Sequence, residues 1–283
     1  MMKCRGIVRP MKNTWPIMAA FTWMASMAQA SPSNPGILLE NLTWQEAEKV
    51  LTPETVVVIP LGAAAKEHGP HLKLKNDFLI AEYLRDRLVE KANVVVAPTL
   101  NYHFYPAFAE YPGSTSLRQD TARDVVVDIV KSLARFGPKR FYVLNTGVST
   151  LRALKPAAEV LAVEGILLTY TDLDVPIAPI EKVIGKQAGG SHADEIETSM
   201  MLVMAPDSVD MTKAVKDYHG DAPGGLTRDP KGKGVYSPSG IWGDATLATK
   251  EKGEKVVTAL VAYVVKDIED LRKAVLPRLA FKH

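Results

Sequence analysis

Four side chains that could bind a metal ion lie within the eleven consecutive residues from Glu67 to Asp77. They are Glu67, His68, His71 and Asp77. Imidazole and carboxylate groups together are ligands suited to zinc, manganese or iron. This run therefore indicates metal-dependent chemistry. The alternative is that the two histidines are surface or capping residues and that Asp77 only starts a helix.

A predicted buried strand comes directly before this run. Residues 55–60 are mostly β-branched and apolar, as in a parallel strand that is covered on both faces, and Gly62 with 63–65 gives a small, turn-permissive exit. The ligand run is therefore expected at the carboxyl end of a strand. In open α/β sheets, ligands bind in the crevice beyond that end.

Strand and helix signals alternate along the rest of the chain, which predicts an α/β fold with a mostly parallel sheet. A capping box at Thr43 predicts a short helix to Leu51, and Asn76 is the expected cap of a helix over 77–91. The further expected strands are 93–97, 140–144 and 166–170, and the further expected helices are 120–136, 151–163, 194–204 and 249–273. Residues 213–239 have no periodicity and are expected to form a long loop that covers the site or contacts another subunit.

The first thirty residues have the three parts of a secretory signal. Four basic residues and no acidic one come first, followed by an apolar stretch over 15–27 and by Ala28-Gln29-Ala30. The apolar stretch is too short for a membrane span. We therefore expect residues 1–30 to be a signal peptide and 31–283 to be the mature domain, exported to a periplasm. A plain amphipathic helix is the alternative.

Removal of this segment changes the charge and the cysteine content. It takes four of the 34 basic residues, so that 30 face 32 acidic residues and the formal net charge passes from +2 to −2. A nearly neutral domain gives no reason to expect nucleic-acid binding, and no membrane contact is expected after cleavage. Cys4, the only cysteine, would be lost as well, so a metal must be held by nitrogen and oxygen ligands.

Four segments carry a resemblance to a known family. They are Leu61-Gly62 with His68-Gly69-Pro70-His71-Leu72 and Asp77, then 111–117 (Tyr-Pro-Gly-Ser-Thr-Ser-Leu), 192–199 (His-Ala-Asp-Glu-Ile-Glu-Thr-Ser) and 240–246 (Gly-Ile-Trp-Gly-Asp-Ala-Thr). Together they resemble the signature of the creatininase (creatinine amidohydrolase) family over roughly residues 40 to 270. The resemblance implies a single-domain, three-layer α/β sandwich, a metal-dependent amidohydrolase activity and a homo-oligomer, often a hexamer.

The resemblance also implies a ligand set. One metal would be held by His68, Asp77 and Glu195. The second metal of the family shares the aspartate and uses a glutamate two residues before the first histidine and a histidine in an Asn-Gly-His-Gly-Gly-Asn turn. This chain has Lys66 at the first of these positions and Gly147 at the second, in the turn 145–150. We therefore expect one divalent metal per chain, zinc or manganese and possibly iron.

Other residues have two interpretations each. His192 is expected to share a helix face with Glu195 and is a proton shuttle or a cap. Glu197 would point away from Glu195 on a helix and anchor a neighbouring loop, or it would touch the metal. His103 could replace the missing histidine or pack among aromatic residues. Trp242 lines the substrate pocket or packs within its loop. Lys66 is a solvated charge or an electrostatic substitute for a second metal.

The sequence predicts hydrolysis of a carbon–nitrogen bond in a small amide or cyclic amide by metal-activated water, with Glu67 or His192 as the proton acceptor. A serine hydrolase is excluded because no Gly-x-Ser-x-Gly elbow occurs. The competing hypothesis is a non-catalytic member of the family that binds a metal or small ligand. A structural protein that keeps only the fold would not need the ligand set.

Overall fold

Five parallel strands form the central sheet of the computed structural model, which describes residues 35–220 and 224–279. The strands are β1 (Ile37–Leu38), β2 (Val56–Leu61), β3 (Val95–Val96), β4 (Arg140–Asn145) and β5 (Leu167–Tyr170). Their order is β1-β3-β2-β4-β5, and every neighbouring pair is parallel. The predicted signal segment 1–30 lies outside the described residues. Among those residues, the structure contains no helix with the length and apolar character needed to cross a membrane.

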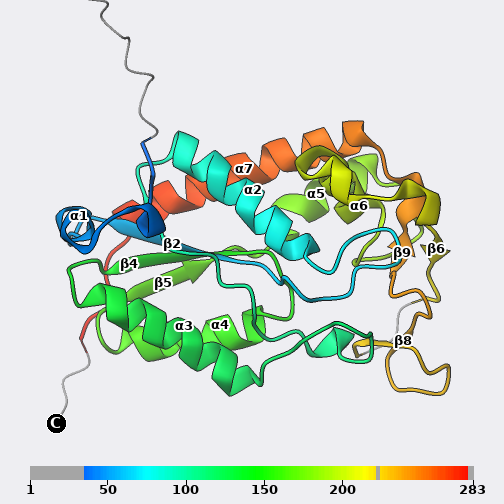
Figure 1. The fold of residues 1–283 in the computed structure, drawn as a ribbon, viewed down its shortest axis with the longest axis horizontal. Helices are drawn as coiled ribbons and strands as arrows, with labels where there is room; N and C mark the ends of the chain where they lie inside the picture. Colours follow the sequence, from blue (N-terminus) through cyan, green and yellow to red (C-terminus); the bar gives the residue numbers. More distant parts are fainter. Residues whose placement is uncertain (1–34, 221–223, 280–283) are drawn as a thin grey trace, which may run out of the picture. The chain divides into compact units, whose positions relative to one another are not determined.

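Helices cover both faces of this sheet, so the molecule has three layers (Figure 1). On one face lie α2 (Asn76–Lys91), α5 (Asp174–Ile184), α6 (Glu195–Met204) and α7 (Lys250–Lys273), and on the other lie α3 (Gln119–Ala134) and α4 (Leu151–Ala162). Each face has its own apolar core. The predicted three-layer α/β sandwich with a parallel sheet is therefore confirmed.

The centre of the sheet is apolar on both sides. All six residues of β2 are buried, and Val57 and Val58 have no exposed surface. Val57 packs in the core with α3 and α4, whereas Val58 packs in the core with α2, α6 and α7, because successive side chains point to opposite faces. The run of apolar, largely β-branched residues in β2 is therefore continuous because both faces of the strand are buried.

Local capping explains several helix starts. At α1 (Trp44–Val50) the predicted capping box is present, with Thr43 and Glu46 each satisfying the other's backbone N–H. The predicted cap at Asn76 is wrong, because Asn76 is already the first residue of α2 and its side chain is used elsewhere.

One helix was not expected from the sequence. Helix α5 contains Pro179 in its interior and Pro176 in its first turn. Proline normally interrupts a helix because it lacks an N–H and its ring clashes with the preceding turn. The segment nevertheless forms a helix that packs against α7 through Ile177 and Ile180.

The expected long loop over 213–239 is partly structured. It contributes β6 (Lys216–Asp217), which pairs antiparallel with β9 (Gly243–Asp244), and β7 (Leu226–Thr227), which pairs with β8 (Val235–Tyr236). The structure also contains short 3-10 helices at Leu39–Asn41, Pro106–Phe108, Pro206–Ser208, Met211–Lys213 and Ala245–Leu247.

Parallel strands end at the same edge of the sheet, so the loops after β2 and β4 meet there, as the hydrogen bond from Thr146 N to Leu61 O shows.

Candidate metal centre

His68 is the buried centre of the polar cluster at this edge of the sheet. Its Nδ1 lies 2.9 Å from the carbonyl oxygen of Lys66, which can only accept, so Nδ1 carries the proton. In the neutral ring, Nε2 then presents a lone pair. This lone pair faces Asp77 Oδ1 at 2.7 Å and Glu197 Oε1 at 3.4 Å. Two carboxylate oxygens thus lie beside the lone pair of Nε2, which requires a second proton or a metal ion between them and the ring.

The charges around His68 support this conclusion. Burial and the Lys66 ammonium act to lower the pKa of His68, but Asp77 and Glu197 outweigh them and raise it to about 9. Burial acts to raise the pKa of Asp77 and of Glu197, but the cationic groups opposite hold both pKa values well below their usual range. Without a metal, the cluster therefore keeps both carboxylates ionised and gives His68 a second proton. A divalent cation fits the same set of donors.

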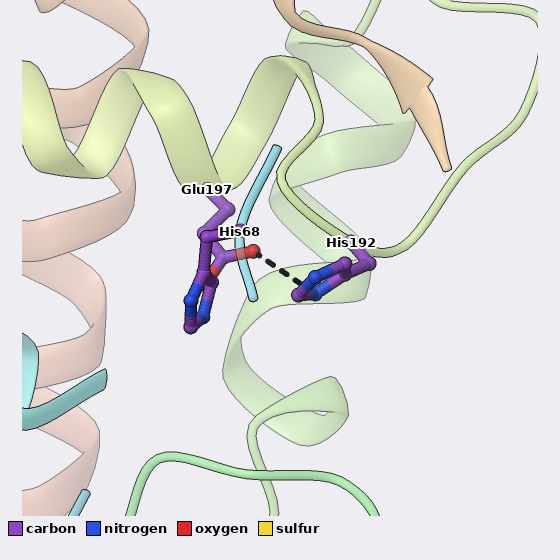
Figure 2. A group of neighbouring side chains, drawn as sticks. All are labelled: His68, His192 and Glu197. Atoms are coloured by element: carbon purple, nitrogen blue, oxygen red, sulfur yellow. Dashed lines mark ion pairs between the residues drawn. The ribbon is translucent and has the colours of Figure 1, made fainter. Parts of the chain in front are cut away.

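His192 and Glu197 face each other beside His68 (Figure 2). His192 Nδ1 lies 3.7 Å from Glu197 Oε2, and the two imidazole rings are 4.9 Å apart between centroids. Among the described residues, His68, His192 and Glu197 form the group of metal-binding side chains whose ligand atoms all lie within 4.8 Å of one another. The structure thus brings together two of the residues predicted from the sequence and one that was expected to point away.

The predicted ligand Glu195 is not part of this cluster, which corrects the expectation. Its carboxylate is fully buried, forms an ion pair with Lys252 of α7, and accepts the backbone N–H groups of Lys186 and Gln187 at 2.8 and 2.7 Å. Asp194 caps α6, so Glu195 is the first helical residue. Glu197, two positions later, lies about 200° further round the helix axis and points towards His68.

His192 does not share a helix face with Glu195. It lies before the cap of α6, in extended backbone that forms a bridge with Trp242. Its Nε2 lies 3.0 Å from the carbonyl oxygen of Glu67 and 3.2 Å from Glu67 Oε2, so Nε2 donates and Nδ1 is left to accept a proton. The predicted pair of proton-transfer residues, Glu67 and His192, is therefore in contact.

The loop that carries Trp242 also encloses Glu67. Gly240 has a φ of +86°, and a Cβ atom there would lie 2.0 Å from Glu67 Oε1. The Glu67 carboxylate also accepts the N–H of Gly69 within its own loop. Glu67 therefore lies behind His192 and orients its ring.

Two side chains tie the ligand loop (62–75) and the start of α2 to α6. Asn76 Nδ2 donates to Glu197 Oε1 at 2.9 Å, and His71 Nε2 lies 2.8 Å from Thr198 Oγ1. Burial lowers the pKa of His71 to about 4, so its ring is neutral near pH 7. His71 is thus a buried structural link, although it stands in the predicted ligand run.

His103 lies outside the cluster. It is 1% exposed and packs edge to face against Tyr105, and burial lowers its pKa to about 4. The suggestion that His103 replaces the missing histidine of the turn 145–150 is not supported by its position. The interpretation as a packing residue among aromatic rings is the one that the structure favours.

A cavity of about 540 Å³ opens beside the cluster. His192, Glu197 and Lys66 line it together with Trp242, and its apolar walls are formed by Phe108, Leu173, Ile177, Met200 and Leu226. Gly224 and Gly225 of the 213–239 segment also line it, so part of this segment contributes to the wall of the cavity. A cavity of this size, mostly apolar with a few convergent polar groups, is typical of a small-molecule site.

The turn after β4 forms another wall without offering a metal ligand. Asn145 Nδ2 donates to Gly147 O at 2.7 Å, and Thr150 Oγ1 lies 2.7 Å from Asn145 Oδ1. Thr146 Oγ1 lies 3.0 Å from Leu61 O and 3.2 Å from Asp77 O. The polar side chains of this turn are therefore used to hold the backbone.

Comparison with known proteins decides the family. A family model described as creatininase, creatinine amidohydrolase, matches residues 40–268. The chain belongs to the creatininase family. As a member of this family it is a metal-dependent amidohydrolase, a hydrolase that acts on carbon–nitrogen bonds other than peptide bonds.

Relatives of the creatininase chain have different names. It is 28% identical to the creatinine amidohydrolase of Pseudomonas putida over 256 residues, covering 83% of this chain and 96% of that protein. It is 25% identical over 264 residues to a 3-dehydro-scyllo-inosose hydrolase of Thermotoga maritima, covering 83% and 84%. It is 28% identical over 214 residues to a mycofactocin precursor peptide peptidase of Mycolicibacterium smegmatis, covering 73% and 81%.

Solved creatininases have the same fold. A crystal structure of creatinine amidohydrolase superposes with a TM-score of 0.69 at 26% identity, covering 85% of this chain and 98% of that one. Other solved creatininases are described as an Mn form, with a TM-score of 0.69, and as a Zn-Zn type, with a TM-score of 0.68. The donors around His68 suit these same metals.

Proposed function

We propose that this creatininase hydrolyses a small amide or cyclic amide at a mononuclear metal centre. The observation that carries the proposal is the position of Asp77 Oδ1 and Glu197 Oε1 beside Nε2 of His68, the ring nitrogen that a metal ion would bind in place of the second proton. These three side chains would hold the metal. A divalent ion at this place would polarise the substrate carbonyl and lower the pKa of a water molecule.

His192 is the proposed proton acceptor. Its Nδ1 faces Glu197 and the cavity, and its Nε2 is occupied by Glu67. Nδ1 would take a proton from the attacking water and return it to the leaving nitrogen, while Glu67 holds the ring in place. General acid–base catalysis of this kind contributes on the order of 10² to 10⁴ in rate.

The cavity supports a small substrate. About 540 Å³ is within the range of ordinary ligand pockets, and Phe108 and Trp242 offer flat apolar surfaces. Because the relatives are named for different substrates, creatinine is only one candidate substrate. Screening should therefore include small linear amides, lactams and cyclic ureides.

The deciding experiment combines metal analysis with an amide panel. Purified mature protein should hold one equivalent of zinc or manganese and release a carboxylate or amine from at least one amide. Glu197→Gln should bind the metal more weakly and cleave the amide more slowly, whereas the control Glu159→Gln, on the exposed face of α4, should match the unaltered protein in both. A protein that binds one metal but cleaves none of the amides would support the competing proposal of a ligand-binding family member.

Export and assembly are further proposals. We propose that the chain is cleaved after Ala30 and resides in a periplasm, on the strength of the sequence pattern over 1–30. N-terminal sequencing of protein from the native host tests this, and a chain that keeps residues 1–30 would contradict it. We also propose that the protein is a homo-oligomer. Light scattering should give the mass of a hexamer.

A further inference from the structure

We infer that Lys66 is a built-in cation of the metal centre, which occupies the place beside Asp77 where a second metal ion would bind and which faces the substrate. The inference rests on the proposed function, because it presumes that a metal is bound at His68, Asp77 and Glu197.

The position of Lys66 is fixed and unusual for a lysine. Its side chain is 6% exposed, and its Nζ lies 2.7 Å from Asp77 Oδ2. The backbone N–H of Lys66 donates to Leu74 O at 3.0 Å, so the residue is anchored within the ligand loop. A buried ammonium is costly unless it is paired. Lys66 is therefore not a solvated surface charge.

Aromatic rings complete the environment of the ammonium. Lys66 Nζ lies 4.6 Å from the centroid of Phe108 and 5.6 Å from that of Tyr105. Cations are attracted to the faces of aromatic rings at these distances. Phe108 and Lys66 both line the cavity, so the ammonium lies at the wall where a substrate would bind.

Asp77 has no oxygen left for a second metal. Oδ1 lies beside His68 Nε2, and Oδ2 lies beside Lys66 Nζ. A second ion at Oδ2 would have to displace the lysine. The nearby turn 145–150 supplies no replacement ligand, because Gly147 has no side chain and the polar side chains of the turn bind backbone oxygens or one another.

The charges of the site balance with one metal and one lysine. Glu67, Asp77 and Glu197 carry three negative charges. One divalent ion and the Lys66 ammonium carry three positive charges. A second divalent ion would leave a net positive site unless Lys66 moved away, and the desolvated position of Lys66 makes such an excess costly.

The ammonium also has a chemical use. As the carbonyl of an amide is attacked, negative charge develops on its oxygen, and a donor fixed in the cavity wall stabilises that charge. Lys66 Nζ has three N–H donors and forms an ion pair with Asp77 Oδ2, so that donors remain for a substrate oxygen. We assign to Lys66 the binding of the developing oxyanion.

The test counts bound metals with Zn²⁺ or Mn²⁺ alone as the probe. The unaltered protein should bind one tight equivalent, and with Mn²⁺ its electron paramagnetic resonance spectrum should be that of an isolated ion. The double variant Lys66→Glu with Gly147→His puts a carboxylate in place of the ammonium and an imidazole in the neighbouring turn, and it should bind a second equivalent. The matched control Lys73→Glu with Gly147→His changes an exposed lysine of the same loop and should stay at one.

A single substitution tests the substrate-facing role. Lys66→Met keeps the length of the side chain without its charge, and should retain one metal while kcat on the amide substrate falls at least 100-fold. Two tight equivalents in the unaltered protein would overturn the inference, as would a folded double variant that binds only one, or an unchanged kcat in Lys66→Met. No metal in the unaltered protein would instead remove the proposed function itself.

Discussion

The two loops that meet at the carboxyl edge of the sheet use their polar groups in opposite ways. The loop after β2 and the first turn of α2 direct His68 and Asp77 towards each other, and His68 also faces Glu197 of α6. The turn after β4 directs Asn145, Thr146 and Thr150 onto backbone oxygens. The first region gathers ionisable side chains around His68, whereas the turn uses its polar side chains on its own backbone. The chemistry of this chain therefore depends on one side of the cleft.

Asp77→Ala should have the largest effect on this contrast. Metal binding should be abolished, and the free energy of unfolding should fall by about 3–5 kcal/mol because Lys66 is left as a buried, unpaired charge. Metal analysis and urea unfolding check both. The double variant Asp77→Ala with Lys66→Met removes both charges, and it should recover part of the stability without recovering the metal. A metal content of one in Asp77→Ala would place the ligands elsewhere.

Glu195→Gln and Glu197→Gln should separate structure from metal binding. Glu197→Gln should weaken metal affinity by about 10-fold to 100-fold. Its free energy of unfolding should change only slightly. Glu195→Gln should keep the metal but lose about 3–5 kcal/mol, because the buried Lys252 loses its partner. Calorimetric metal titration and thermal unfolding of both variants give the comparison. The reverse pattern would restore Glu195 as the ligand.

The metal-free protein should lose stability as pH rises from about 6.5 to about 9. The pKa of His68 is raised to about 9 in the folded state. The stabilisation that protonated His68 gives the folded state is therefore complete below its unfolded-state pKa near 6.5, and it is lost as the pH rises above the folded-state pKa. The total change is on the order of 3 kcal/mol. Urea unfolding with a chelator at several pH values measures it. Metal affinity should change in the opposite direction and rise with pH, because the ion displaces the proton.

Thr150→Val should have the smallest effect. The hydroxyl of Thr150 is fully buried and donates within the turn to Asn145 Oδ1 or Gly147 O. Its removal with little change of shape should cost about 1–2 kcal/mol and leave metal stoichiometry and affinity unchanged. A loss of metal in this variant would show that the turn after β4 helps to position the metal ligands. It would contradict the separation between this turn and the loop after β2.

Most of the fold could be predicted because its signals are local. The β-branched run of β2, the capping box at Thr43 and the helical periodicities each act over a few residues. Helix α5 was missed because Pro176 and Pro179 oppose helix formation locally, and only packing against α7 reverses the balance.

The candidate site was predicted less completely. His68, Asp77, Glu67 and His192 lie close together, whereas the choice between Glu195 and Glu197 depends on which side of α6 faces His68. The expected start of this helix, at residue 194, differs from the observed start at Glu195 by one residue, and both glutamates are followed by residues that the structure buries. The sequence spacing contains no signal for the direction in which each glutamate points. The cap at Asp194 and the bridge between His192 and Trp242 fix how the chain enters α6.

The distance along the chain between the partners at this centre bears on the order of folding. The contacts from His192 to Glu67 and from His71 to Thr198 join residues 125 and 127 positions apart. Loops of this length close slowly, because chain entropy is lost before any contact compensates for it. The ligand loop and β2 leave the ribosome long before α6. Metal uptake during refolding should therefore mark the completion of the native topology rather than its beginning.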